Sequence, residues 1–182
     1  FLAHPIVAVV AGDPQAEGRT RLFSVDSAGD LHAWSAGDNG QWASSLLAAD
    51  VTRDPAHAAL LLQDFDGNGR PDLLLHDGDG FRVYDLAEDG VRVMAEERAR
   101  LRALVPVLID PARGPALVGV VSEGDTHGLK AWLAGEGRHG FLAIAPSGRS
   151  DAADGMRSNP SGIGTELLLR VGDRWTRVDA YG

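Results

Sequence analysis

Oxygen-bearing side chains alternate along one short stretch of the sequence. Asp64, Asp66, Asn68 and Asp72 occupy every second position except one, and Arg70 fills the remaining place. A hard cation such as Ca²⁺ takes roughly six to eight oxygen ligands, among them carboxylate and carbonyl oxygens. The Arg70 guanidinium cannot bind a cation, but its backbone carbonyl could. The pattern predicts one cation site, because four such groups without a counter-charge would repel one another.

Two glycines allow this loop to curl around an ion. Gly67 and Gly69 stand between the acidic residues, and glycine reaches positive φ without strain. Mg²⁺ fits less well, because it prefers strict octahedral geometry and keeps several waters. An EF-hand begins with the same pattern, but it needs flanking helices and a Glu at loop position twelve, where Leu75 stands. The remaining alternative is an acidic hairpin loop without an ion.

Short apolar runs separated by Gly and Asp turns surround the acidic loop. Such runs are typical of β-strands, and patterns with the helical period are scarce. The best helical candidate is AEERARLRAL, at residues 95–104. The sequence predicts an all-β chain in which the acidic loop joins two strands.

Similar segments recur along the chain, each with a large aromatic residue in a strand. Trp34, Tyr84 and Trp132 are separated by 50 and 48 residues, and each is followed by a Gly/Asp/Glu turn and another strand. A period of about 45–50 residues with four strands per unit is typical of β-propeller blades. The alternative is an ordinary β-sandwich with accidental similarity. The expected blades cover about residues 1–48, 49–99 and 100–149.

The acidic loop resembles the calcium loop of the FG-GAP/VCBS repeats, the blades of integrin-type β-propellers. Their motif is Asp-x-Asp-Gly-x-Gly-x-x-Asp followed by an apolar strand. The matching residues are Asp64, Asp66, Gly67, Gly69, Asp72 and Leu73–Leu75. The resemblance implies one Ca²⁺ with a backbone ligand from Arg70. The implied side-chain ligands are those of Asp64, Asp66, Asn68 and Asp72.

The neighbouring repeat units lack the full ligand set. Residues 13–22 align without gaps on residues 64–73, but Arg21 stands where Asp72 does and would oppose a cation. The loop that begins at Asp110 is two residues shorter and keeps only that one ligand. We expect one calcium site in three units, acting as a staple for its loop.

The last part of the chain departs from the repeat. Residues 150–182 begin with a polar, Gly/Pro-rich stretch and end in two alternating strands, at about Glu166–Val171 and Arg174–Tyr181. Residues 158–164 resemble the opening of the ASPIC/UnbV domain, which typically follows FG-GAP repeats. The match is partial, because Thr165–Leu167 replace the Ala-Arg-Val that is usual in that family. We expect residues 150–182 to form a partial ASPIC/UnbV-like segment.

The composition argues against several classes of function. The 182 residues carry 17 Lys and Arg against 26 Asp and Glu, a net charge of −9, which argues against nucleic acid as a partner. No apolar run is long enough to span a bilayer, so the chain is not expected to span a membrane. Cysteine is absent, which removes disulfides and cysteine nucleophiles.

Motifs that look catalytic have simpler explanations. GEGRHG, at residues 135–140, matches the dinucleotide fingerprint but precedes a strand-like run, which favours a hairpin turn. The six histidines show no metal-binding spacing, and most are expected at the surface. No G-x-S-x-G nucleophile motif is present. The chain is not expected to be an enzyme.

The resemblance implies a calcium-stabilised, non-catalytic propeller module that serves as an interaction or adhesion platform for an unidentified protein or glycan. It also implies an extracytoplasmic location (secreted, periplasmic or cell surface), where millimolar calcium fills weak sites. One alternative is a carbohydrate-binding module, since Trp34, Trp42, Trp132 and Trp175 could stack on sugars. Others are an enzyme, such as a lyase or an enediyne-pathway protein, or an accessory domain of a larger enzyme.

Overall fold

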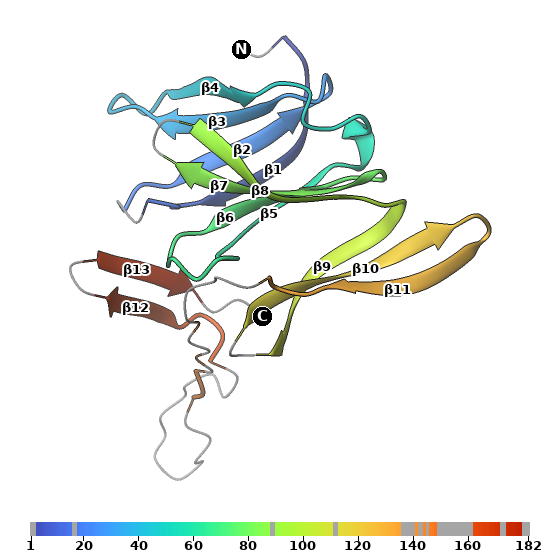
Figure 1. Cartoon of the computed structure of the whole chain (residues 1–182). Helices are drawn as coiled ribbons and strands as arrows, with labels where there is room; N and C mark the ends of the chain where they lie inside the picture. Colours follow the sequence, from blue (N-terminus) through green and yellow to red (C-terminus); the bar gives the residue numbers. More distant parts are fainter. Residues whose placement is uncertain are drawn as a thin grey trace. The chain divides into compact units, whose positions relative to one another are not determined.

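Antiparallel β-sheets make up the described part of this computed structural model (Figure 1). The prediction of an all-β chain is confirmed: the described residues form thirteen strands and one short 3₁₀ helix, Pro55–His57, but no α-helix. None of their helices is long and apolar enough to cross a membrane. The chain divides into two units, residues 1–140 and 141–182. The structure describes residues 3–15, 18–87, 90–110, 113–135, 141, 144, 146–148, 162–171 and 174–179.

Two four-stranded sheets share one simple order, in which consecutive strands pair side by side and antiparallel. The Gly and Asp turns allow this order, since antiparallel neighbours need only a tight connection. The first sheet comprises β1 (Ile6–Gly12), β2 (Arg21–Asp26), β3 (Leu31–Ala36) and β4 (Trp42–Ala48). The second comprises β5 (Ala59–Gln63), β6 (Asp72–His76), β7 (Gly80–Ala87) and β8 (Gly90–Arg98).

A three-stranded antiparallel sheet follows in the sequence. It comprises β9 (Leu101–Asp110), β10 (Gly114–Glu123) and β11 (Thr126–Trp132). The strand expected after the GEGRHG turn falls largely outside the described residues, as do residues 136–140 of that turn. No described strand pairs with a strand of another sheet, and the described sheets form no closed propeller.

The same leucine–aromatic pair recurs in the three sheets. In each, the aromatic residue singled out by the sequence repeat lies directly opposite a leucine of the neighbouring strand. Cross-strand neighbours of this kind share a face and pack against each other. The three pairs are Leu22–Trp34, Leu73–Tyr84 and Leu117–Trp132.

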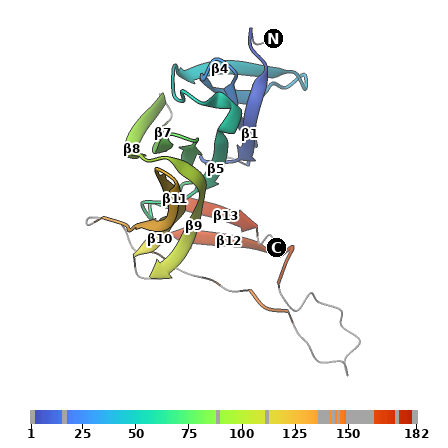
Figure 2. The ribbon, with the colours of Figure 1, turned by 90° about the vertical axis from the view of Figure 1, so that its right-hand side faces the viewer.

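The core of residues 1–140 lies between the faces of successive sheets, which follow one another from top to bottom in Figure 2. Phe23 and Val25 of the first sheet share one buried cluster with Leu73 and Leu75 of the second. A second cluster joins Leu74 and other residues of the second sheet to the third sheet. The three leucines of β6 are each at most 2 % exposed, because this strand is covered on both faces.

The helix expected at residues 95–104 is wrong. Residues 95–98 belong to β8, and Leu101–Leu104 begin β9. Ala, Glu and Arg favour helices in isolation, but here Ala95 pairs with Val83 across the sheet and Leu101 and Leu104 are buried. Packing against the neighbouring strands overrides the intrinsic preference.

The unit at residues 141–182 contains a two-stranded hairpin. It comprises β12 (Glu166–Val171) and β13 (Arg174–Asp179), which pair antiparallel from Glu166–Asp179 to Val171–Arg174. Both strands begin where the alternating pattern predicts. Residues 149–161, which contain much of the ASPIC/UnbV-like motif, lie outside the described part of the chain.

Candidate metal centre

The acidic loop joins β5 to β6 and ends at a buried aspartate. Asp72 is the first residue of β6, and it pairs across the sheet with Gln63, the last residue of β5. Paired strands therefore hold the two ends of the loop at neighbouring positions. Asp72 is 0 % exposed, which is unusual for an ionisable residue without a charged partner.

Asp64 organises the backbone of the loop. Its Oδ1 accepts a hydrogen bond from the Gly67 N–H at 2.6 Å, and its Oδ2 accepts one from the Gly69 N–H at 2.8 Å. The two glycines have φ of 79° and 78°, in the left-handed region where other residues are strained. The loop therefore needs glycine at both positions, as its sequence predicts.

Asp66 and Asn68 shape the middle of the loop. Asp66 accepts hydrogen bonds from the Asn68 N–H at 2.9 Å and from the Asn68 side-chain amide at 3.1 Å. Asn68 Oδ1 in turn accepts one from the Arg70 N–H at 2.7 Å. Bonds from a side-chain oxygen to the backbone two residues on are Asx turns, and they fix the side-chain rotamers. Their oxygens keep lone pairs for a further ligand.

Asp72 completes the cluster with an oxygen that has no partner. Its Oδ2 accepts a hydrogen bond from the Phe65 N–H at 2.8 Å. Its Oδ1 is buried and has no hydrogen-bond partner in the described part of the chain. One carboxylate oxygen from each of Asp64, Asp66 and Asp72 lies within 4.8 Å of the other two. A buried carboxylate beside two others is costly unless a cation balances the charge.

The pKa values of two of these carboxyl groups reflect that cost. Burial, together with the nearby charges of Asp66, Asp64 and Asp85, raises the pKa of Asp72 to about 7, against the lowering effect of the Phe65 hydrogen bond. Burial also raises the pKa of Asp64, against the effect of its two backbone hydrogen bonds. Without an ion, these carboxyl groups therefore take up a proton at a higher pH than ordinary aspartates do.

The donor set fits a hard divalent cation. Asp64, Asp66 and Asp72 supply carboxylate oxygens, and Asn68 supplies an amide oxygen next to them. Oxygen donors of these types are the ligands of Ca²⁺, which tolerates irregular geometry and does not need thiolate or imidazole. The backbone ligand expected from Arg70 stays a prediction.

The corresponding loop of the first sheet repeats one contact of the acidic loop. Asp13 Oδ2 accepts a hydrogen bond from the Gly18 N–H at 2.6 Å, five residues along the chain, as Asp64 does from Gly69. Arg21 begins β2 where Asp72 begins β6. This loop therefore shares one hydrogen bond of the acidic loop but not its buried carboxylate.

The connection between β9 and β10 is a short turn. Asp110 ends β9, and its backbone carbonyl accepts a hydrogen bond from the Arg113 N–H at 2.9 Å. Its carboxylate lies 3.4 Å from the Arg113 guanidinium. An ion pair therefore balances the single carboxylate that this loop retains.

The structure brings together a second acidic group that sequence analysis missed, at the turn between β2 and β3. Asp26, Asp30 and His32 have ligand atoms within 4.8 Å of one another. His32 is only 8 % exposed, so it is an exception to the expectation of surface histidines. Its Nε2 lies 3.1 Å from Asp26 Oδ2.

The hydrogen bonds of Asp26 give this group a structural role. Asp26 Oδ1 accepts hydrogen bonds from the N–H groups of Ala28 and Asp30, at 2.9 and 3.1 Å. Burial alone would raise the pKa of Asp26, but the bonds from Asp30, His32 and Ala28 hold it below its usual value. Asp77, 51 residues later, caps the corresponding turn of the second sheet through Oδ1. The two aspartates occupy equivalent positions in successive repeat units, and this spacing is the sequence signal that could have identified Asp26.

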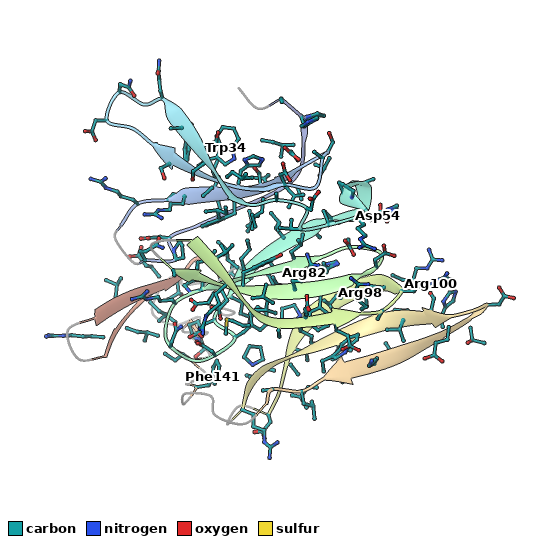
Figure 3. The ribbon with its side chains drawn as sticks, turned by 45° about the horizontal axis from the view of Figure 1, so that its top comes forward. Trp34, Asp54, Arg82, Arg98, Arg100 and Phe141 are labelled. Atoms are coloured by element: carbon teal, nitrogen blue, oxygen red, sulfur yellow. The ribbon has the colours of Figure 1, made fainter. Side chains whose placement is uncertain are left out.

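A polar groove of about 560 Å³ lies near the ends of the sheets that are opposite the acidic loop. Successive turns of an antiparallel meander lie at alternate ends of the sheet, so the turn between β6 and β7, which lines the groove, lies at the other end from the acidic loop. It shares His76, Asp77 and Asp79 with a second hollow of about 390 Å³. Arg82 and Arg98 line the groove, and Arg100 lines the second hollow. Figure 3 labels all three arginines. The groove carries charges of both signs, which suits a polar ligand.

Arg82 is the fixed cation of this groove. It donates a hydrogen bond from Nη1 to the Val51 carbonyl at 2.7 Å, and its Nε lies 3.2 Å from Glu96. The Val51 contact joins the second sheet to the segment that leads into it from β4. Thr52, next in the same segment, donates a hydrogen bond to Asp77. The groove is therefore held together by contacts between the second sheet and the segment that precedes it.

No protein-family model matches this chain, and no curated protein does.

Proposed function

We propose that this chain is a calcium-binding, non-catalytic β-propeller module that serves as an interaction platform. The observation that carries the proposal is the carboxylate of Asp72, which is fully buried and has one unpartnered oxygen beside Asp64 and Asp66. One Ca²⁺ bound by the side chains of Asp64, Asp66, Asn68 and Asp72 and by the Arg70 carbonyl balances this charge. The ion then acts as a staple that holds the loop between β5 and β6 in its folded conformation.

The blade assignment is supported by the repeated order of the sheets. Two four-stranded meanders and a three-stranded one stack face to face, and each carries a leucine–aromatic pair at the same register position. Radial repetition of such sheets is how propellers bury both faces of every blade. The calcium loop of the second sheet resembles that of FG-GAP/VCBS blades, which supports the same assignment.

The polar groove is the proposed platform. It lies away from the calcium loop, so a partner and the ion do not compete for the same side chains. Its mixed charges favour a polar protein segment or a glycan over an apolar ligand. We expect the protein to act outside the cytoplasm, where calcium is abundant enough to fill a site of modest affinity.

Carbohydrate binding is the second candidate, and one exposed tryptophan favours it. Trp42 is 46 % exposed at the start of β4. By contrast, Trp34 donates a hydrogen bond to Ser24 at 2.8 Å, and Trp132 packs edge-to-face on Phe81 with ring centroids 5.2 Å apart. Among the tryptophans whose side chains the structure describes, a sugar-binding role would therefore depend on Trp42. Quenching of its fluorescence by glycans, absent in Trp42→Phe, tests this candidate.

Calorimetric titration with calcium tests the leading proposal. The parent protein should bind one calcium per chain with a dissociation constant of roughly 10⁻⁴ to 10⁻³ M, as extracellular modules do. The Asp66→Ala variant lacks one carboxylate ligand and should bind no calcium over the same range of calcium concentration. Asp79→Ala, in the groove, is the matched control and should bind as the parent does. A parent protein that takes up no calcium would contradict the proposal.

A further inference from the structure

Three exposed arginines alternate along the segment that connects β8 to β9. They are Arg98, Arg100 and Arg102, and together they form the arginine row. The residues between them turn inward: Leu101 is 6 % exposed, and Ala99 packs against the same core cluster. Side chains two residues apart in an extended segment lie on one face. The three guanidinium groups therefore project from the side of the segment that faces away from the core.

Backbone hydrogen bonds fix the segment that carries the arginine row. The N–H groups of Ala99 and Leu101 donate to carbonyls of the turn between β6 and β7, at 3.1 and 3.0 Å. The Arg100 carbonyl accepts a hydrogen bond from the Ser122 N–H of β10 at 2.9 Å. Extended backbone advances by about 6 to 7 Å over two residues. The row therefore presents its cations at a regular spacing on a backbone that is held on both edges.

The arginine row borders both cavities at this end of the sheets. Arg98 lines the polar groove, and Arg100 and Arg102 line the second hollow. Arg98 and Arg100 are labelled in Figure 3. The two cavities share part of their lining, at the end of β6 and in the turn that follows it. A ligand that follows the row therefore contacts both cavities.

Most acidic side chains of the two cavities already have partners. Both carboxylate oxygens of Asp54 lie within 2.9 Å of His57 Nδ1. Glu96 and Glu97 each pair with a cation, at 3.2 and 3.0 Å. Both oxygens of Asp77 accept hydrogen bonds from neighbouring groups. The other two acids of the lining are Asp50 and Asp79.

The arginine row, by contrast, has donors to offer. Within the part of the chain that the structure describes, the side chains of Arg98 and Arg100 have no hydrogen bond and no ion pair. Arg102 uses its Nε, which donates to Ser122 Oγ at 3.3 Å. The cavities are therefore basic in what they present to a ligand along this row, although the whole chain carries a net charge of −9.

We propose that the arginine row binds an acidic polypeptide segment in an extended conformation. A guanidinium group binds a carboxylate through two parallel hydrogen bonds, and clusters of arginine recognise acidic motifs in this way. Alternate Asp or Glu residues of an extended segment have the same spacing as the arginines, so each carboxylate meets one guanidinium. This inference rests on the proposed function, because it names the chemistry of the partner that the platform binds.

The lining of the cavities favours a polypeptide over an anionic glycan. Sugars bind well where an exposed aromatic ring offers a flat apolar face. Among the residues that line the two cavities, Phe81 is the one Phe, Tyr or Trp, and it is 6 % exposed. Its ring packs edge-to-face on Trp132 and is not open to a sugar. The available groups are hydrogen-bond donors with positive charge, which suit carboxylates.

Fluorescence anisotropy with the 182-residue protein and a labelled peptide of alternating Glu and Thr tests the inference. The parent should bind this peptide, because its carboxylates fall on one face of an extended chain. A control peptide has the same number of Glu residues, placed at every third position, which puts successive carboxylates on opposite faces. The control peptide should bind at least about tenfold more weakly, since it cannot engage neighbouring arginines together.

Substitutions in the arginine row test which residues make the contact. Arg98→Ala and Arg100→Ala should each weaken binding of the alternating peptide by at least about tenfold, because each removes a charge-assisted contact. Arg92→Ala is the matched control. It removes the same charge from another exposed arginine of β8, one that pairs with Asp85, and should bind as the parent does. If an alanine variant fails to fold by circular dichroism, the glutamine variant takes its place.

Several results would overturn the inference. One is a parent that does not bind the alternating peptide, and another is equal weakening in Arg92→Ala. A third is a heparin fragment that binds through Arg98 and Arg100 while the peptide does not, which would make the partner a sulfated glycan. Calcium titration of the same samples separates this inference from the calcium site. A parent that binds calcium but not the peptide contradicts the acidic partner alone, and one that binds the peptide but no calcium supports the partner and contradicts the calcium site.

Discussion

Asp72 Oδ2 accepts a hydrogen bond from the Phe65 N–H at 2.8 Å, and this bond links the acidic loop to the core. Phe65 is 2 % exposed and belongs to the cluster between the second and third sheets. The aspartate that completes the candidate ligand set therefore also fixes the backbone of a core residue. Any ion that binds Asp72 stabilises that packing, because the folded loop is required to form the site.

Asp72→Asn should separate the two roles of this residue. The amide keeps an oxygen that accepts the Phe65 hydrogen bond but removes the buried negative charge. We expect the ion-free variant to unfold at a higher temperature than the ion-free parent, because the repulsion from Asp64 and Asp66 is gone. Calcium affinity should fall by at least about tenfold, since one charged ligand is lost. Thermal unfolding in chelator and calorimetry with calcium measure the two effects, and unchanged calcium affinity would contradict the ligand assignment.

Protons and calcium should compete for the acidic loop. The folded-state pKa of Asp72 is raised to about 7 from an ordinary value of 3.8. The protonated form therefore contributes stability that is complete below about pH 4 and is lost as pH rises through 7. In chelator, the unfolding free energy of the parent relative to Asp72→Asn should fall between these pH values. Calcium should reverse this trend and stabilise the parent more at pH 8 than at pH 5, as thermal melts across this range can measure.

Asp26→Ala should destabilise the first sheet without affecting calcium. The substitution removes the acceptor for the N–H groups of Ala28 and Asp30 and the partner of the buried His32. Leaving such groups unpaired costs about 1–3 kcal/mol. Chemical denaturation should show that loss in the presence and absence of calcium alike. A calcium-dependent loss would mean that the group at Asp26 also binds the ion.

Much of the fold follows from local sequence signals. Alternating apolar residues and Gly/Asp turns predict strands, and the chain is all-β. The spacing of Trp34, Tyr84 and Trp132 predicts equivalent strands, and each of these residues lies opposite a leucine of the preceding strand. The glycines of the acidic loop predict left-handed backbone, which Gly67 and Gly69 adopt. The strands and turns depend on residues close in sequence, and the leucine–aromatic pairs recur with the repeat.

Features that depend on distant packing were not predictable in the same way. Residues 95–104 have helix-forming side chains, but their partners are 12 to 20 residues away or in another sheet, as Ala95–Val83 and Leu104–Gly119 show. The burial of His32 requires Asp26 in the neighbouring strand. The unpartnered oxygen of Asp72 also could not be read from the spacing, because it follows from burial between sheets.

The central claim is that calcium stabilises the fold through the acidic loop. Saturation at about 100 times the dissociation constant should add roughly 2.7 kcal/mol to the free energy of unfolding of the parent. Asp66→Ala should abolish this gain, because it deletes a ligand carboxylate that lies beside Asp64 and Asp72. Two control variants should keep the gain. Arg70→Ala retains the backbone carbonyl that is the expected ligand, and Asp110→Ala changes the short connection between β9 and β10.

The most direct measurement is the shift of the thermal midpoint between chelator and saturating calcium, compared for the parent and these three variants. We predict a large upward shift for the parent, Arg70→Ala and Asp110→Ala, and no shift for Asp66→Ala. If Asp66→Ala gains as much stability from calcium as the parent does, the acidic loop is not the calcium site.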